Sequence, residues 1–456
     1  MTTPQQTLPP RFRNRIFLIL SILGLFLNQA QAADWPWFQG PDSNSTSPET
    51  GLARTWPSTG PRVLWTVPVE EGYASAAIRD GQVYLLDRIG TTTDTLRVFD
   101  LENGRELWSF SYEAKCEKKY PFYGSRSTPA VTEDSVYITG AMGDIHAIDR
   151  KTHQPIWKRH ILKDFEGATF PNWAVSTSPA VYQDKILVSL QNHPTGVVAL
   201  DRKTGKTVWQ TPADSLKGLV AGIYHSPRVL TLDGVDQIVM WTVESSDTVN
   251  QIMHGHIVSF SAADGHLLWS VQHDTGFLAS PVAVGANRVL LTGDYTAGTV
   301  LIEVKRAAAG SASEFETKIV FDTQDFGSQL HMPILYKDHF YLTSNGNKHH
   351  DGLVCVGVDG KMRWQTSNTR ELPGFVPNLP NFDRGNLILA GGLLYVLDSI
   401  KGDLRLLEPS PEGYRELGCA PKILDGKEMW APMALSNGKL VIRDKSQMKC
   451  LDVKKP

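Results

Sequence analysis

The chain has 456 residues, with 45 basic and 48 acidic side chains and a formal net charge of -3. Its length exceeds that of one ordinary hydrophobic core and predicts either several domains or a repeat array. The near balance of charge, without a long run of one sign, gives no support to a nucleic-acid partner or to binding at an anionic membrane surface. The content of glycine (38), proline (27) and tryptophan (12) favours an all-β chain rich in turns.

The first 32 residues have the order of a secretory signal peptide. Three arginines (Arg11, Arg13 and Arg15) precede an apolar run over residues 16–27, and the small-residue sequence AQA follows at 30–32. A retained anchor is the alternative, but the run is shorter than the roughly 20 apolar residues that span a bilayer. We therefore expect cleavage before Ala33 and an exported protein, periplasmic or secreted, with no membrane span after cleavage.

Residues 33–61 predict a leader in front of the main domain. Its Ser-, Thr- and Pro-rich part is typical of a flexible tether. Trp35, Trp37 and Phe38 would be unusual in a tether, so we expect the leader to pack on a face of the domain that follows. Directly after it, VLWTVPV at residues 63–69 predicts a strand that carries Trp65.

A sequence motif recurs along the chain, and its clearest copy is DRKTGKTVW at residues 201–209. Asp starts a tight turn by accepting backbone hydrogen bonds, Gly supplies a positive φ, and the chain returns as a strand that ends in Trp. If such hairpins stand side by side, each indole docks on the neighbouring unit. The predicted docking residues are Trp65, Trp108, Trp157, Trp209, Trp269 and Trp364. Two units carry KIVFDT and YRELG instead, which predicts looser docking.

A second motif precedes each copy of the first. It predicts a short strand, a turn and a second, apolar strand. Its prolines recur at intervals of about 50 residues: Pro129, Pro179, Pro227, Pro281 and Pro333. The wider gap to Pro432 holds two units, because NLILAGGLLYVLD falls inside it, and Ala76 marks the first unit. Eight units of four short strands predict an all-β, eight-bladed β-propeller as a single domain over residues 62–456.

Both ends of the chain indicate how the ring closes. The last unit stops after LVIRD and MKCLDV without an outer strand of its own, whereas the strand with Trp65 precedes the first unit. We expect that N-terminal strand to complete the eighth blade, which removes exposed strand edges.

The complete pattern A-x-D-x-x-x-G-x-x-x-W at Ala199, Asp201, Gly205 and Trp209 resembles the tryptophan-docking motif of pyrroloquinoline-quinone-type propellers. That superfamily includes quinoprotein alcohol dehydrogenases and the non-catalytic propeller of the outer-membrane assembly lipoprotein. The leader and the C-terminal LVIRDKSQMKCLDV resemble exported propeller-only proteins of planctomycete-type bacteria, whose functions are largely unassigned. Because the motif holds blades together, the resemblance implies a fold and not an activity.

Residues at the start of each inner strand converge on one mouth of a propeller channel. Aromatic and cationic side chains at these positions predict a binding site for a planar or sugar-like ligand, and a simple plug of the channel is the alternative. The candidate residues are Tyr73, Tyr123, Arg126, Trp173, His225, His331 and Trp430.

Enzymatic hypotheses have weaker support in the residues. A quinoprotein dehydrogenase resembling this fold would hold pyrroloquinoline quinone between a Trp floor and a vicinal disulfide, with calcium and an Asp base, and no Cys–Cys pair is present. Trp173 is the candidate floor, and Asp294 or Asp351 the candidate base or calcium ligand. His349 and His350 suggest a metal site, but a solvated turn is the better interpretation. A glycan-active enzyme would need a carboxylate pair, and none is identifiable.

The four cysteines carry two different expectations. Cys355 and Cys450 lie in apolar strand-like runs and predict buried thiols, whereas Cys116 and Cys419 lie in polar stretches where a disulfide could form.

The sequence thus predicts an exported, non-catalytic, monomeric scaffold without a metal or a cofactor. Its partner would be a protein, peptide or glycan of the cell envelope, and its alternative function is a quinone-dependent alcohol or sugar dehydrogenase. The expected interaction loops are residues 113–126, 162–175, 243–255 and 366–383.

Overall fold

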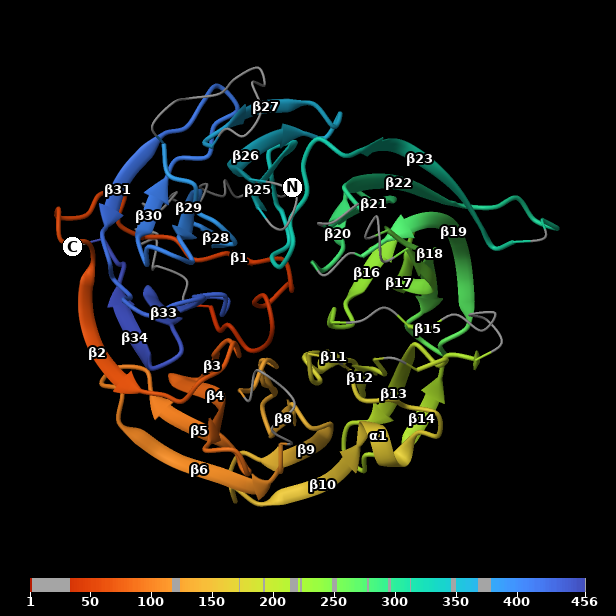
Figure 1. The fold of residues 1–456 in the computed structure, drawn as a ribbon, viewed down its shortest axis with the longest axis horizontal. Helices are drawn as coiled ribbons and strands as arrows, with labels where there is room; N and C mark the ends of the chain where they lie inside the picture. Colours follow the sequence, from red (N-terminus) through yellow and green to blue (C-terminus); the bar gives the residue numbers. More distant parts are fainter. Residues whose placement is uncertain are drawn as a thin grey trace.

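The computed structural model describes Met1 and residues 33–116, 124–171, 173–191, 193–213, 220–221, 224–247, 252–276, 279–293, 297–311, 313–345, 350–367 and 379–455. In this part of the chain the strands form eight sheets arranged in a ring (Figure 1), and the one helix is the short α1, Ile161–Asp164. No helix within these ranges combines the length and the apolar character that a membrane crossing requires.

The blades follow one another along the chain. Blade 1 consists of β3 (Ala77–Arg79), β4 (Gln82–Ile89), β5 (Thr93–Asp100) and β6 (Glu106–Glu113), and blade 2 of β7 (Ala130–Val131), β8 (Ser135–Thr139), β9 (Asp144–Asp149) and β10 (Pro155–His160). Blade 3 consists of β11 (Ala180–Tyr182), β12 (Lys185–Ser189), β13 (Val197–Asp201) and β14 (Thr207–Gln210). Blade 4 consists of β16 (Val229–Leu232), β17 (Val235–Asp247), β18 (Ile252–Ser261) and β19 (Leu267–Thr275), with β15 (Val220–Ala221) paired to β17.

The remaining blades use both ends of the chain. Blade 5 consists of β20 (Val282–Val284), β21 (Arg288–Thr292), β22 (Thr299–Arg306) and β23 (Phe315–Thr323), and blade 6 of β24 (Ile334–Tyr336), β25 (His339–Asn345), β26 (His350–Gly357) and β27 (Met362–Gln365). Blade 7 consists of β28 (Asn386–Ala390), β29 (Leu393–Leu397), β30 (Leu404–Leu407) and β31 (Glu416–Ala420), with β1 (Thr46–Ser47) on its inner side. Blade 8 consists of β32 (Ala434–Ser436), β33 (Lys439–Arg443), β34 (Gln447–Asp452) and β2 (Arg62–Pro68).

The eight-bladed propeller and its closure are as predicted. Strand β2 pairs antiparallel with β34, and Trp65 stands opposite Cys450 in that pair. The N-terminal strand is therefore the outer strand of blade 8.

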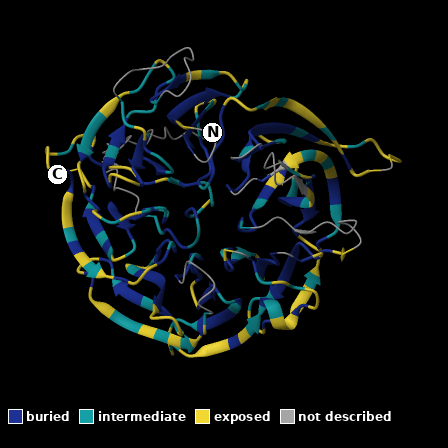
Figure 2. Cartoon of the chain, viewed as in Figure 1, coloured by how far each residue is buried: buried dark blue, intermediate teal, exposed yellow. Residues whose placement is uncertain are grey.

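Burial within each blade explains why the sequence patterns differ between its strands. The middle strands, such as β8 and β29, are buried at every position, because both of their faces pack on neighbouring blades. The outer strands alternate, as in β6, because one face meets solvent. Figure 2 shows this as a dark inner body with an exposed rim.

The docking residues join consecutive blades. Trp65 Nε1 donates a hydrogen bond to the Leu101 carbonyl of blade 1 (2.9 Å), and Trp157 Nε1 donates to the Arg202 carbonyl of blade 3 (3.0 Å). Trp209 lies against Gly265 of blade 4, and Trp364 Nε1 donates to the Ser410 carbonyl of blade 7 (2.8 Å). Each indole thus combines a large apolar contact with a polar anchor or a close glycine.

Two docking sites depart from the motif. In blade 2, His153 takes the place of the glycine at a φ of 60°, and Trp108 stacks on its ring with a centroid distance of 4.2 Å. Trp269 instead donates to Gln237 Oε1 of its own blade (2.7 Å), since the β22–β23 connection of the next blade has no copy of the Asp–Gly turn.

Blades 5 and 7 replace the missing tryptophan in different ways. Phe321 of blade 5 lies against Gly360 of blade 6, as a tryptophan would. In blade 7 the leader supplies an indole: Trp56 docks on Gly418 of β31, and its ring is 5.9 Å from that of Tyr395 in β29 of the same blade. This contribution of the leader is not visible in the repeat pattern.

Residues 243–255 differ from their prediction, and the four cysteines are free thiols. Residues 243–255 were expected as a loop, yet β17 continues to Asp247 and β18 begins at Ile252, so most of the segment is a hairpin. The β18 arm is also held to β19 by a polar pair, His254 Nδ1 and Asp274 Oδ1 (2.8 Å). Cys355 and Cys450 are buried as predicted, and no disulfide joins Cys116, after β6, to Cys419 in β31.

Candidate functional site

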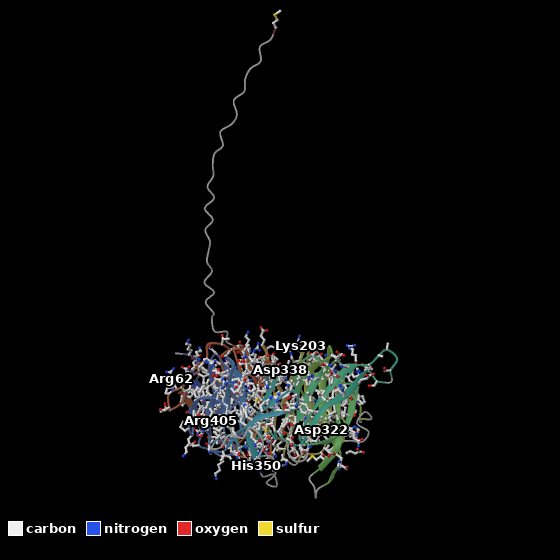
Figure 3. The ribbon with its side chains drawn as sticks, turned by 90° about the horizontal axis from the view of Figure 1, so that it is seen from above. Arg62, Lys203, Asp322, Asp338, His350 and Arg405 are labelled. Carbon is white, nitrogen blue, oxygen red and sulfur yellow. The ribbon has the colours of Figure 1, made fainter. Side chains whose placement is uncertain are left out.

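The ring has two different faces. One face, which we call the turn face, carries the tight turns between the first and second strands and between the third and fourth strands of the blades. The opposite face, which we call the loop face, carries the connections from one blade to the next. In Figure 3, Lys203 and Asp338, both in tight turns, lie at one edge of the disc, whereas His350 at the start of β26 lies at the opposite edge. The candidate site residues that the structure describes all precede inner strands and therefore belong to the loop face.

The leader occupies the turn side of the channel. Trp35 and Ile78 of β3 exchange two backbone hydrogen bonds (2.9 and 2.8 Å), and the Val131 N–H of β7 donates to the Pro36 carbonyl (2.8 Å). Strand β1 then pairs in parallel with β28 of blade 7, two blades away from β3 around the ring (Figure 1). Because Trp35 is only 1% exposed, this leader is a packed part of the domain and not a tether.

Carboxylate contacts fix the leader further along. Glu49 accepts hydrogen bonds from the backbone N–H groups of Asn437 (2.6 Å) and Gly438 (2.7 Å) in the first turn of blade 8. Burial raises the pKa of Glu49, and these hydrogen bonds oppose that rise. The leader therefore contacts inner strands or turns of blades 1, 2, 7 and 8.

On the loop side, three of the candidate residues form one cluster. The rings of Tyr73 and Trp430 stack with a centroid distance of 5.2 Å and an interplanar angle of 21°. The guanidinium of Arg126 lies 5.7 Å from the centroid of Tyr73, at cation–π distance. We call Tyr73, Arg126 and Trp430 the loop-mouth cluster; it joins blade 8 to the entries of blades 1 and 2.

Charged neighbours hold this cluster in place. The Tyr73 hydroxyl donates to Glu428 Oε2 (2.7 Å), and Lys445, which also pairs with Glu428, lies 5.1 Å from the centroid of Tyr73. Burial raises the pKa of Tyr73 to about 12, so the hydroxyl keeps its proton as a donor. The guanidinium of Arg384 lies 5.9 Å from the centroid of Trp430. Sequence reasoning missed Glu428, Lys445 and Arg384, although Glu428 and Arg384 also directly precede inner strands.

The other candidates lie apart from the cluster or deeper in the ring. Trp173 is 52% exposed, and its backbone N–H donates to the Tyr224 hydroxyl (3.1 Å). His225 and His331 are buried, and burial lowers the pKa of each to about 4, so both are neutral at pH 7. Tyr123 lies outside the described residues.

Trp173 and Asp351, two of the residues named for a quinone site, do not meet in the structure. Trp173 precedes blade 3 and is half exposed, whereas Asp351 is buried in β26 of blade 6, where its Oδ2 accepts a hydrogen bond from the Ser344 hydroxyl (2.9 Å). Asp294 and His349 fall outside the described residues. Within those residues no three His, Cys, Asp or Glu side chains gather into a group that could hold a metal ion. Trp173 and Asp351 therefore do not form one site for a quinone with calcium.

Comparison with known proteins gives a family match. The model of the family described as outer membrane protein assembly factor BamB matches residues 46–222 and 253–417. The polyvinylalcohol dehydrogenase of Sphingopyxis sp. (strain 113P3) is 27% identical over 183 residues, 38% of this chain and 25% of that protein. The BamB protein of Yersinia pestis is 23% identical over 255 residues, 50% of this chain and 61% of that protein. The chain thus spans less than two thirds of the length of either relative.

Solved structures agree on the fold. The structure of BamB from Moraxella catarrhalis has a TM-score of 0.55 at 14% identity and covers 86% of this chain and 99% of that chain. The quinohemoprotein alcohol dehydrogenase from Comamonas testosteroni has a TM-score of 0.60 at 11% identity, covering 93% of this chain and 81% of that chain. Since one fold occurs in an assembly factor and in an enzyme, function has to be argued from the site.

Proposed function

This chain belongs to the family described as outer membrane protein assembly factor BamB, and we propose that it is an exported, non-catalytic scaffold of the cell envelope whose loop face binds a protein partner. The family description supports an envelope role, and the loop face supplies the residues. Export is supported by the basic and apolar order of residues 11–32.

The observation that carries the proposal is the gathering of aromatic and arginine side chains on the loop face. Trp, Tyr and Arg dominate the binding energy of protein interfaces, and an exposed indole offers a large apolar contact area. Trp173 is such an indole, and the loop-mouth cluster is held rigidly by stacking and hydrogen bonds. Rigid anchors lose little conformational entropy on binding, which favours affinity.

Site-specific photo-crosslinking in the producing cell tests this proposal. A benzophenone amino acid at Trp173 is compared with one at Val208, which is 50% exposed on the outer strand β14. We expect adducts from position 173 only, sensitive to protease, and weakened at least tenfold by a Tyr73→Ala, Trp430→Ala double substitution. Equal adducts from both positions, or none from position 173, would overturn the loop-face assignment. Adducts that resist protease but yield to glycosidases would identify a glycan instead.

The dehydrogenase alternative has its own test. Titration with pyrroloquinoline quinone and calcium, in wild type and in an Arg126→Ala, Trp173→Ala variant, measures cofactor binding directly. Under the scaffold proposal no saturable binding occurs. Saturable binding that the variant loses would overturn the non-catalytic part of the proposal and assign an oxidoreductase.

A further inference from the structure

A cavity of about 190 Å³ lies inside the ring, between the leader and the inner strands of blades 3 to 5. Leader residues Trp37, Phe38 and Gln39 form one wall, and Ser178, Ser226 and Arg228 contribute to the other. This space is large enough for a small organic molecule, and it combines aromatic surface with a few polar groups, as ligand sites do. It is separate from the loop-mouth cluster, since none of that cluster's residues lines it.

Arg228 brings a buried positive charge to this cavity. Its side chain belongs to a residue that is 9% exposed, and its Nη1 donates to the Pro281 carbonyl. Within the described part of the chain, its Nε has no hydrogen-bond partner and no carboxylate lies within ion-pair distance. Burial lowers the pKa of Arg228 to about 10, and Asp42 of the leader, which also lines the cavity, opposes this effect from beyond ion-pair distance. The guanidinium is therefore charged at pH 7 and has no counter-charge in contact among the described residues.

Gln39 adds an acceptor to the same cavity. The residue is 6% exposed, and among the described residues its Oε1 finds no donor. Its backbone is fixed, because Gln39 takes a φ of 65° and its carbonyl accepts from the Ser45 N–H (2.8 Å). Arg228 and Gln39 thus both line one space, and each carries a buried polar atom without a hydrogen-bond partner among the described residues, which is unfavourable.

These atoms define the chemistry of an occupant. A carboxylate meets a guanidinium with two parallel hydrogen bonds and supplies the missing negative charge. A hydroxyl on the same molecule can donate to Gln39 Oε1, and its carbon skeleton can lie along Trp37 and Phe38. We propose that this cavity is a binding site for a small hydroxycarboxylate, such as a hydroxy acid or a sugar acid, held by Arg228 and Gln39.

Calorimetric titration of the mature protein with four probes tests the site: gluconate, lactate, acetate and glucose. We expect saturable binding of gluconate or lactate, binding of acetate at least tenfold weaker because it lacks the hydroxyl, and no binding of glucose, which lacks the charge. Loss of a charge-assisted hydrogen bond corresponds to about 10- to 100-fold in affinity, so Arg228→Met weakens binding by at least that factor.

Two further variants keep the result interpretable. Arg62→Met removes a positive charge at an exposed position on β2 and leaves hydroxycarboxylate binding unchanged. Gln39→Leu keeps the charge of Arg228 and removes the acceptor, so it lowers the preference for lactate over acetate. This variant still tests the site if Arg228→Met does not fold. Absence of saturable binding up to 10 mM of every probe, or binding that Arg228→Met and Gln39→Leu both leave intact, would overturn the proposal. Crosslinking from position 173 is unaffected by Arg228→Met, so this site and the partner surface are tested separately.

Discussion

Trp157 of blade 2 lies so close to Gly205 of blade 3 that a Cβ on this glycine would come within 2.6 Å of Trp157 Cδ2. The glycine also has a φ of 69°, a conformation that other residues adopt at a cost. Conformation and contact therefore both require glycine at this position of the docking motif.

Gly205→Ala is expected to destabilise the protein by about 2–4 kcal/mol, because the backbone is strained and the indole is displaced. Gly234→Ala is the control, since Gly234 has a φ of 75° with nothing within 4 Å of the added Cβ. Urea unfolding should show a loss of about 1 kcal/mol for the control. Equal losses for the two variants would show that the contact with Trp157 contributes nothing.

His153 allows the stacking contribution to be separated from backbone strain. His153→Gly relieves the positive φ but loses the stack on Trp108, so we expect a nearly unchanged stability. His153→Ala keeps the strain and loses the stack, and should be about 1 kcal/mol less stable than wild type. Thermal unfolding of the three proteins measures both differences. A stability of His153→Ala equal to that of wild type would rule out a stabilising stack.

Buried His225 predicts a loss of stability in acid. Burial lowers its pKa from the ordinary 6.5 to about 4, so the unfolded chain binds a proton over this range and the folded protein does not. Stability is therefore complete above pH 6.5 and falls as the pH drops towards 4, by up to roughly 3 kcal/mol for this residue. In His225→Asn the slope of the unfolding free energy against pH should decrease by up to the contribution of one bound proton. An unchanged slope would contradict the prediction.

Trp56→Ala is expected to destabilise the protein by about 1–3 kcal/mol, although the residue lies in the leader, because its ring docks on Gly418 and Tyr395 of blade 7. Trp173→Ala removes a side chain that is 52% exposed and should change stability by less than about 0.5 kcal/mol. Differential scanning calorimetry of the two variants provides the comparison. If both lose the same stability, Trp56 has no docking role.

The fold was predictable because its evidence is periodic. The spacing of Pro129, Pro179 and their equivalents gave the number of blades, and the strand at Trp65 gave the closure. The convergence of Tyr73, Arg126 and Trp430 also follows from the repeat, because equivalent positions of neighbouring blades meet at one mouth.

Features made by single, non-repeated contacts were not predictable. The leader meets the ring through isolated pairs, such as Trp35 with Ile78, and nothing in its sequence indicates which inner strand it contacts. The cavity at Arg228 forms only where this leader passes blades 3 to 5, so its lining comes from segments far apart in the chain. The β17–β18 hairpin was missed because the polar run of residues 244–247 lacks the alternation that predicts a strand.

The pairing of β2 with β34 also determines the order of folding events. Strand β2 is made early and has to wait for β34, the last strand, so the chain emerging from a ribosome or a translocation pore carries an unpaired β-edge until its C-terminal residues arrive. Ring closure joins residues at opposite ends of the sequence, and contacts of such high sequence separation form slowly. A chaperone that shields the nascent β2 segment would therefore act at the stage when this propeller is most prone to aggregate.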